Sequence, residues 1–190
     1  MSRNAKKLKI YTAPGLKLDF GCGKNKKEGF LGVDIIEFDG VDCVLDIGTE
    51  KWPWKDNSVE EAHASHFIEH LGPEERIHFC NELYRVLKFG AKFTMICPHW
   101  NSGRAYGDMT HKWPPVCEFW FYYLNKEWRK VNSPHLDIEH NPKGYNCHFE
   151  IVAGYNVRQD LMTMNEERRN FSLQNYKEAA QDTIAHWTKI

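Results

Sequence analysis

A short apolar run that ends in a glycine turn constrains this chain more than any other feature. Leu16–Phe20 predicts a buried strand, and the Gly21-Cys22-Gly23 turn directly after it lets the backbone approach a ligand closely. An acid, Asp34, ends the next apolar run, and only ten residues separate it from Gly23. Because ten residues cannot hold both a helix and a strand, we expect the first crossover to be a loop, Lys24–Gly29.

Further apolar runs and turn signals predict an α/β domain. We expect strands over 30–36, 41–47, 59–65, 92–97, 149–157 and 183–190. The clearest helix begins at Gly72-Pro73 with two acids in its first turn, and Lys88 and Gly90 close it. Two more helices are expected, around 117–125 and over 166–181. This order of elements predicts a layered domain with a mostly parallel sheet.

Size, charge and cysteine content narrow the class of protein. A chain of 190 residues suits one domain, and a formal net charge of −1 provides no overall field to hold a polyanion. The basic cluster Arg3, Lys6, Lys7 and Lys9 is interpreted as a solvated leader, with a nucleic-acid arm as the alternative. Six scattered cysteines without a secretory signal indicate a reducing cytoplasm. No apolar run approaches the ~20 residues of a membrane span.

Polar residues stand where the predicted strands end, and ligands of open α/β sheets bind beyond those ends. Asp34 ends the second strand, where an acid can accept hydrogen bonds from both hydroxyls of a ribose. Asp46-Ile47 ends the third strand and is placed to meet an adenine amino group. The fourth strand ends in 65–71, which includes His66. Four strand ends in this order and spacing predict a single nucleoside-binding site.

Several motifs resemble those of class I S-adenosylmethionine (SAM)-dependent methyltransferases, in particular the small type-11-like group. Leu18–Gly23 resembles motif I of that family, and Gly32–Ile35 resembles its acidic second-strand motif. Asp56–Val59 followed by Ser65–Leu71 is similar to the stretch around strand four. Glu82–Gly90 is similar to the helix that leads into strand five. One departure is Asn25, which stands near the third glycine of the broader family motif; asparagine tolerates left-handed backbone there.

The resemblance implies a Rossmann-like, doubly wound, mostly parallel seven-stranded sheet with a shortened first crossover helix. It implies a single methyltransferase domain over 1–190, with a cofactor-binding half at 16–98 and a substrate-side half at 99–190. SAM is the implied cofactor. The residues expected to bind it are Asp19, Gly21, Cys22, Gly23, Asp34, Ile35, Asp46, Ile47 and His66. For the cofactor carboxylate we expect the amides of the glycine turn plus one leader residue, with Lys24 and Lys26 as other candidates.

The acceptor side is expected just past strand five. His99, Asp108 and His111 lie there in a polar, glycine-containing segment and are the predicted catalytic residues. Methyl transfer is a displacement at carbon that depends mainly on positioning, and a base is needed only if the nucleophile must lose a proton. The aromatic stretch 113–123 either caps the sheet or stacks on a planar substrate. A small-molecule acceptor is expected, with no membrane partner; the sequence does not name the acceptor.

Alternative functions fit the sequence less well. The protein could bind SAM as a regulator or consume it by another route. A nucleic-acid methyltransferase is disfavoured because the expected motif after strand four is replaced by Ser65–Ile68 and the chain is not basic. A nicotinamide-dependent oxidoreductase requires a third glycine and a full helix after Gly21–Gly23. Metal sites need ligands that converge at fixed geometry, whereas His63, His66 and His70 span a strand end and a loop, so we expect no metal site.

Overall fold

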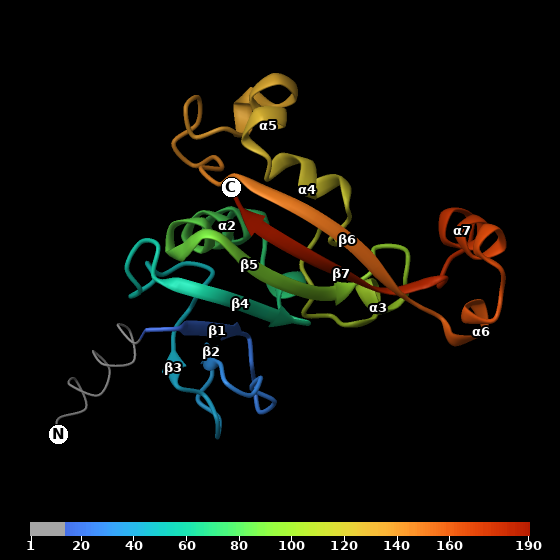
Figure 1. Cartoon of the computed structure of the whole chain (residues 1–190), viewed down its shortest axis with the longest axis horizontal. Coiled ribbons are helices and arrows are strands. Elements are labelled where there is room, and N and C mark those ends of the chain that lie inside the picture. The colour runs from blue at the N-terminus through green and yellow to red at the C-terminus, as the bar shows by residue number, and fades with distance from the viewer. Residues whose placement is uncertain (1–13) are drawn as a thin grey trace.

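Seven strands form one sheet in the order β3-β2-β1-β4-β5-β7-β6 (Figure 1). The computed structural model describes residues 14–190. The strands are β1 (Leu16–Phe20), β2 (Leu31–Asp34), β3 (Cys43–Val44), β4 (Val59–Ser65), β5 (Leu87–Pro98), β6 (Phe149–Val157) and β7 (Ala180–Lys189). Strands β1 to β5 pair in parallel, and β7 runs antiparallel to both β5 and β6. The predicted seven-stranded, mostly parallel sheet is confirmed.

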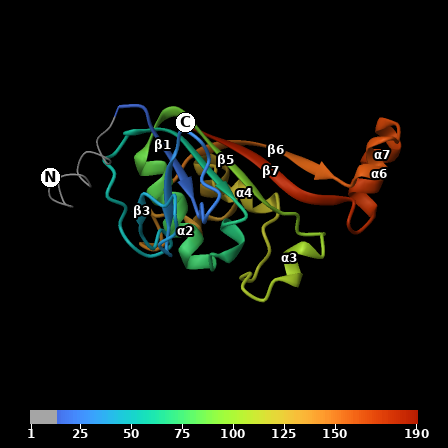
Figure 2. The same cartoon turned by 90° about the horizontal axis from the view of Figure 1, so that it is seen from below.

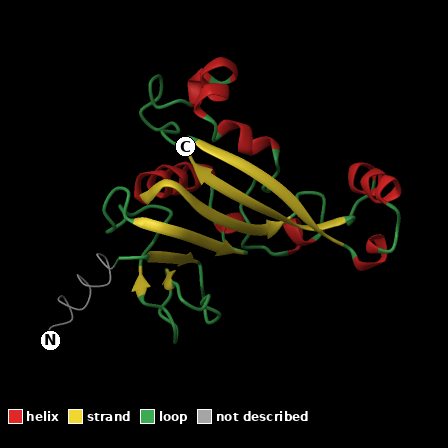
Figure 3. Cartoon of the chain, viewed as in Figure 1, coloured by secondary structure: helices red, strands yellow, loops and turns green. Residues whose placement is uncertain are grey.

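Within residues 14–190, helices lie only in the connections after β4. They are η1 (Ile68–His70), α2 (Pro73–Val86), α3 (Arg104–Gly107), α4 (Phe119–Tyr123), α5 (Lys126–Asn132), η2 (Pro134–Leu136), α6 (Gln159–Met162) and α7 (Glu166–Asn175). The chain passes from β1 through β2 and β3 to β4 in loops alone (Figure 3). The first crossover is a loop as predicted, and the next two crossovers are loops as well. None of the helices within residues 14–190 is long and apolar enough to cross a membrane.

An aromatic core lies on one face of the sheet. The ring of Phe79 on α2 packs 5.3 Å from Phe20 on β1 and 5.7 Å from Phe93 on β5, measured between ring centroids. On the neighbouring strand β7, Trp187 stacks on Phe93 and also contacts Trp120 of α4. Because α2 and α4 pack on the same row of side chains, they lie on the same side of the sheet (Figure 2). The predicted aromatic cap therefore contributes directly to this core.

The opposite face of the sheet carries polar side chains. Asp19, His63, Thr94 and His186 stand side by side across β1, β4, β5 and β7. The Nδ1 atom of His63 lies 2.7 Å from the Asp19 carboxylate, and the Thr94 hydroxyl lies 3.2 Å from Nδ1 of His186. Parallel sheets are normally covered on both faces. A row of hydrogen-bonded polar groups makes this face compatible with water.

Two predicted helix ends are wrong. Helix α2 stops at Val86 rather than at Gly90, because Leu87 has an extended backbone and pairs with Val59 of β4. Gly90, with φ of 76°, lies inside β5 instead of capping the helix. Helix α7 stops at Asn175, and β7 begins at Ala180 rather than at 183. In each case strand pairing with a distant segment overrides the local helical pattern.

Helices α5 and α6 were not predicted. Helix α5 begins at an asparagine cap, where Asn125 accepts a hydrogen bond from the amide of Trp128. Helix α6 has only four residues and lies with α7 at the tip of the β6–β7 hairpin, away from the other helices (Figure 1). Neither helix carries enough apolar periodicity to be predicted from sequence.

The glycine turn after β1 is held tightly by its surroundings. Gly21 and Gly23 have φ of 62° and 50°, in the left-handed region, whereas Asn25 does not adopt that conformation. The loop that replaces the first helix is fastened to β1 because Asp19 accepts a hydrogen bond from the Lys27 amide at 2.8 Å. A Cβ added to Gly21 would lie 2.4 Å from the ring of Phe67, whereas one added to Gly23 would meet nothing within 4 Å.

We therefore expect Gly21→Ala to be far more costly than Gly23→Ala. Both changes strain a left-handed residue by ~1–2 kcal/mol, but only Gly21→Ala also drives a methyl group into the partly buried ring of Phe67, which adds ~1–3 kcal/mol. Chemical denaturation of the two variants would measure the difference in free energy of unfolding. Equal losses in the two variants would contradict the packing argument.

Candidate functional site

A pocket of ≈ 470 Å³ lies beyond the carboxyl ends of β1, β2, β3 and β4. Its walls are Gly21, Asp34, Ile35, Ile36, Leu45, Asp46, Ile47, Gly48, His66, Phe67, His70, Leu71 and Glu75. Six of the residues predicted to bind the cofactor line it: Gly21, Asp34, Ile35, Asp46, Ile47 and His66. The four strand ends therefore converge on one cavity, as their order in the sequence suggests.

Two carboxylates in this pocket are fixed by backbone amides. Asp34 accepts hydrogen bonds from the amide of Gly23 at 2.9 Å and from that of Ile36 at 3.0 Å, one on each oxygen. Asp46 accepts from the Gly48 amide at 3.1 Å and from the Thr49 hydroxyl at 2.6 Å. Each carboxylate oxygen has a second acceptor position. Both acids are thus oriented by the protein and can still accept hydrogen bonds from a ligand.

Apolar side chains lie between these two acids. Ile35 and Ile36 are 62% and 56% exposed, although large aliphatic side chains are usually buried. Leu45, Ile47 and Leu71 complete the apolar lining. The pocket is therefore an apolar slot whose lining also carries hydrogen-bond acceptors.

Three predicted cofactor residues do not line the pocket. Asp19 is buried, and its carboxylate is occupied by the Lys27 amide and His63. Cys22 is also buried; burial, aided by Asp19 and other nearby carboxylates, raises the pKa of its thiol to about 11, so it is uncharged at neutral pH. Gly23 contributes through its hydrogen bond to Asp34. All three shape the loop that forms one wall.

The expected partners for a cofactor carboxylate need revision. The amides of Gly21 and Cys22 both donate to the Val33 carbonyl, and the Gly23 amide donates to Asp34. The glycine-turn amides are therefore already occupied within the protein. Lys26 is paired with Asp42 at 2.8 Å, whereas the Lys24 ammonium group contacts only the ring of Phe38 among the interactions described. Arg3, Lys6, Lys7 and Lys9 lie outside the described residues.

Seven pocket residues were not singled out from the sequence: Ile36, Leu45, Gly48, Phe67, His70, Leu71 and Glu75. Three of them belong to the run 65–71. The position of this run directly after strand four is the sequence feature that could have predicted them. Glu75 comes from the first turn of α2, where it also caps the helix by accepting from the Gly72 amide. Leu45 and Gly48 lie in the loop between β3 and β4. No local sequence pattern predicts the path of this loop.

Two of the three predicted catalytic residues lie together beside this pocket. The His111 ring is 4.8 Å from that of His70, between centroids, and its Nε2 lies 3.9 Å from the Asp108 carboxylate. Thr110 donates to Asp108 at 2.7 Å, and its hydroxyl lies 3.0 Å from Nδ1 of His70. A second cavity of ≈ 210 Å³, lined partly by Asp108 and His111, adjoins the cluster. His70, which also lines the first pocket, links the two cavities.

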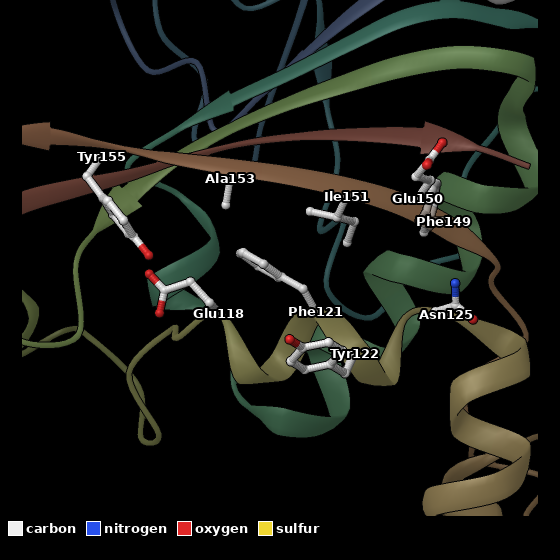
Figure 4. Close-up of a pocket in the computed structure, with 9 residues that line it drawn as sticks. All are labelled: Glu118, Phe121, Tyr122, Asn125, Phe149, Glu150, Ile151, Ala153 and Tyr155. Carbon is white, nitrogen blue, oxygen red and sulfur yellow. The ribbon is translucent and has the colours of Figure 1, made fainter. Parts of the chain in front are cut away.

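The third predicted residue, His99, lies elsewhere. It is buried at the end of β5, with Nε2 3.3 Å from the Glu118 carboxylate, and it lines neither cavity. The Glu118 carboxylate points toward the Tyr155 hydroxyl at one end of a further pocket of ≈ 430 Å³ between α4 and edge strand β6 (Figure 4). Burial alone would raise the pKa of Glu118, but the hydrogen bond and charge of His99 lower it overall. His99 therefore holds an ionised carboxylate in place at the sheet edge.

His66 occupies a strained position directly after β4. Its φ of 52° is in the left-handed region, which a non-glycine residue rarely adopts outside functional turns, and its amide donates to the Ile96 carbonyl at 2.8 Å. Its Nδ1 lies 3.4 Å from Oε1 of the buried Glu69. The nearby Glu69 carboxylate, opposed by partial burial, raises the pKa of His66 above its usual value.

This arrangement of strands defines the fold of the class I SAM-dependent methyltransferases, as the motifs predicted. A SAM-dependent methyltransferase from Archaeoglobus fulgidus aligns with 98% of this chain and 91% of its own, at a TM-score of 0.64 and 21% identity. Geranyl diphosphate C-methyltransferase from Streptomyces coelicolor A3(2) aligns with 98% of this chain and 80% of its own, at a TM-score of 0.50 and 12% identity. No protein-family model and no curated protein sequence matches the chain. At these identities the likeness establishes the fold alone.

The His66–Glu69 contact predicts a measurable titration. We expect the pKa of His66 to lie above ~6.5 and to fall in Glu69→Gln. Since the folded state favours protonated His66, the stabilisation is complete below the ordinary histidine pKa and is lost as pH rises through the raised one. NMR titration of the imidazole protons would measure this, with His148 as an internal reference. Burial lowers the pKa of His148, and Glu69→Gln leaves it unchanged. An unshifted His66 would contradict the assignment.

Proposed function

We propose that this protein is a methyltransferase that binds SAM at the carboxyl ends of β1 to β4 and transfers its methyl group to a small organic molecule. The observation that carries the proposal is the apolar slot between Asp34 and Asp46. Adenosine presents a flat apolar ring, two ribose hydroxyl donors and an amino donor. Asp34 accepts from the ribose, Ile35 packs against the ring, and Asp46 accepts from the adenine amino group.

The position of the pocket supports this assignment. Ligands of open α/β sheets bind outside the carboxyl ends of the strands, near the point where strand order reverses. That point lies between β1 and β4 here, because β2 and β3 extend the sheet on one side of β1 and β4 extends it on the other. The methyltransferases that share the fold agree with the proposal.

The loop after β1 argues against a dinucleotide. Dinucleotide sites place a pyrophosphate at the N-terminus of a helix that follows the glycine turn. The chain continues from Gly21–Gly23 into a loop, so no helix dipole is available there. The only anionic group of SAM at that end is a carboxylate. Lys24 is available to bind it, because no ion pair is described for its ammonium group in this turn. A nicotinamide cofactor is therefore disfavoured.

The acceptor enters beside His111 and Asp108. Tyr106, Met109 and Trp113 line the ≈ 210 Å³ cavity with these residues, and all three are exposed apolar side chains. Exposed apolar groups around a small cavity favour an organic acceptor over a polyanion. One protein of the same fold is named for a small acceptor, geranyl diphosphate. His111 and Asp108 orient the acceptor, and His99 acts at a distance by fixing Glu118.

The proposal includes a reducing, cytoplasmic setting. The six cysteines form no disulfide, and Cys117 is the only one that is not buried. Cysteines distributed in this way act as small apolar core residues.

Calorimetric titration of the full chain tests the cofactor assignment. We expect one molecule of SAM or S-adenosylhomocysteine to bind per chain, with no measurable binding of NAD. Methyl-labelled SAM with a cell extract would then identify the class of compound that receives the label. Binding of SAM without label transfer would favour the regulatory alternative, and binding of NAD alone would overturn the proposal.

Asp34→Ala should weaken SAM binding by about 1–3 kcal/mol, since the carboxylate accepts charge-assisted hydrogen bonds from the ribose. This corresponds to a loss of about 5- to 150-fold in affinity. Asp39→Ala is the matched control, because Asp39 is an exposed acid in the same loop and does not line the pocket. Thermal unfolding of both variants would show whether the loop stays intact. Wild-type affinity in Asp34→Ala would remove the basis of the assignment.

A further inference from the structure

Glu69 is a buried carboxylate that lacks a hydrogen-bond partner. Its side chain is only 6% exposed, and neither carboxylate oxygen has a partner among the described residues. The contact with Nδ1 of His66 at 3.4 Å does not satisfy hydrogen-bond geometry. Buried charged groups in proteins are paired or coordinate metal ions. The one ion-pair partner described for Glu69 is His66, whose side chain is half exposed, so both carboxylate oxygens can still accept a further cationic ligand.

Two imidazoles face the same space. One ligand atom from each of Glu69, His70 and His111 lies within 4.8 Å of the other two. Around a bound ion, with ligand bonds of about 2.0–2.2 Å, these atoms would be about 3–3.5 Å apart. The three ligand atoms would need to move together by roughly 1 Å to reach these separations. Rotation of the His70 and His111 side chains can supply this movement.

The hydrogen bonds of both histidines leave a nitrogen lone pair available. Nδ1 of His111 lies 3.2 Å from the Ala105 carbonyl, which can only accept, so Nδ1 carries the proton. The Thr110 hydroxyl donates its one hydrogen to Asp108, so it accepts from Nδ1 of His70. In the neutral form of each ring, Nε2 then carries the lone pair. Histidines that bind metals are oriented in this way, with the other nitrogen donating to a carbonyl or carboxylate relay.

A buried arginine holds the two segments that supply these groups. Arg76 donates to the carbonyl of Ile68 at 3.3 Å, of Lys112 at 3.4 Å and of Pro114 at 2.7 Å. The Lys112 amide also donates to the Glu69 carbonyl at 2.8 Å. The cluster is thus built on a fixed frame. All hydrogen bonds described for Arg76 go to carbonyls, so the Glu69 carboxylate is not satisfied by it.

We propose that Glu69, His70 and His111 bind a divalent transition metal ion at the junction of the two cavities. Two imidazoles and one carboxylate suit Zn²⁺, Fe²⁺, Mn²⁺ or Co²⁺ and leave coordination positions open. The site departs from the expectation that the chain binds no metal. That expectation considered only the histidines at 63, 66 and 70, whereas His111 is distant in the sequence and joins His70 only in the fold. Metal binding is independent of the proposed function. Only the role of the ion, to bind an acceptor oxygen and lower its pKa, rests on that function.

Co²⁺ titration of the tag-free, chelator-treated full chain tests the site. We expect one ion per chain, with visible ligand-field bands and no thiolate charge-transfer band, since five of the six cysteines are buried. Zn²⁺ should displace the Co²⁺ and bind in calorimetry. Glu69→Gln and His111→Ala should each weaken binding by about 100-fold or more, and Thr110→Val, which removes an outer hydrogen bond, by about tenfold. His140→Ala is the control, because His140 is exposed and lies outside the cluster.

Two outcomes would overturn the site: no stoichiometric binding by the wild-type chain, or equal binding by the wild type, Glu69→Gln and His111→Ala. His111 lies at the surface of a cavity, so its variant is expected to fold even if Glu69→Gln destabilises the chain; circular dichroism would check both. If Glu69 serves only as the partner of His66, Glu69→Gln lowers the pKa of His66 and leaves Co²⁺ binding unchanged. SAM titration of the metal-free protein tests the proposed function separately.

Discussion

Buried backbone carbonyls need hydrogen-bond donors, and this constraint shapes the segment between β5 and β6, where all the helices are short. Two arginines supply the donors. Arg129, fully buried, pairs with Asp137 and donates to the carbonyls of Tyr123, Tyr145 and Cys147, which holds the turns after α4 against the sheet. Arg76 does the same for the segment before α4. Removing a guanidinium from water is costly, and burial therefore lowers the pKa of Arg76. The Arg76 side chain stays buried only because carbonyl groups accept its hydrogen bonds. The positions of His70 and His111 depend on this bonding.

A second constraint is the sheet face that no described helix covers. On that face the alternation along each strand places charged and polar groups, such as the Lys17–Glu61 pair and the Asp19–His63 pair, instead of the apolar runs of a doubly covered parallel sheet. The absence of crossover helices after β1, β2 and β3 is therefore consistent with the side chains beneath. It also means that a loop, rather than a helix, forms the pocket wall that follows β1. Asp19 and the close contact between Gly21 and Phe67 give that wall the rigidity that a helix would otherwise provide.

Strands and their ends were predictable because the signals are local. The apolar run Leu16–Phe20, the glycine turn and Asp34 lie within a few residues of one another, and the ten-residue spacing alone excluded a helix. The end of α2 was not predictable, since Leu87 leaves the helix only to pair with Val59. Glu69 was also missed as a separate feature. Its burial and its proximity to His111 depend on two segments that are more than forty residues apart in the sequence and that Arg76 joins. A contact between such distant segments leaves no periodic pattern in the sequence.

On the proposed function, the position of Glu69 would matter for the chemistry of methyl transfer. A sulfonium carries a positive charge that leaves the sulfur as the methyl group moves. A bare carboxylate close to that sulfur would stabilise the reactant more than the transition state and so would slow the reaction. Glu69 lies between His66 and His70, two residues that line the pocket, so its charge is felt there. A cation that neutralises Glu69, whether protonated His66 or a metal ion shared with His70 and His111, removes this penalty. A metal ion would also lower the pKa of an acceptor oxygen bound to it, and this would tie the buried acid to the acceptor side of the site.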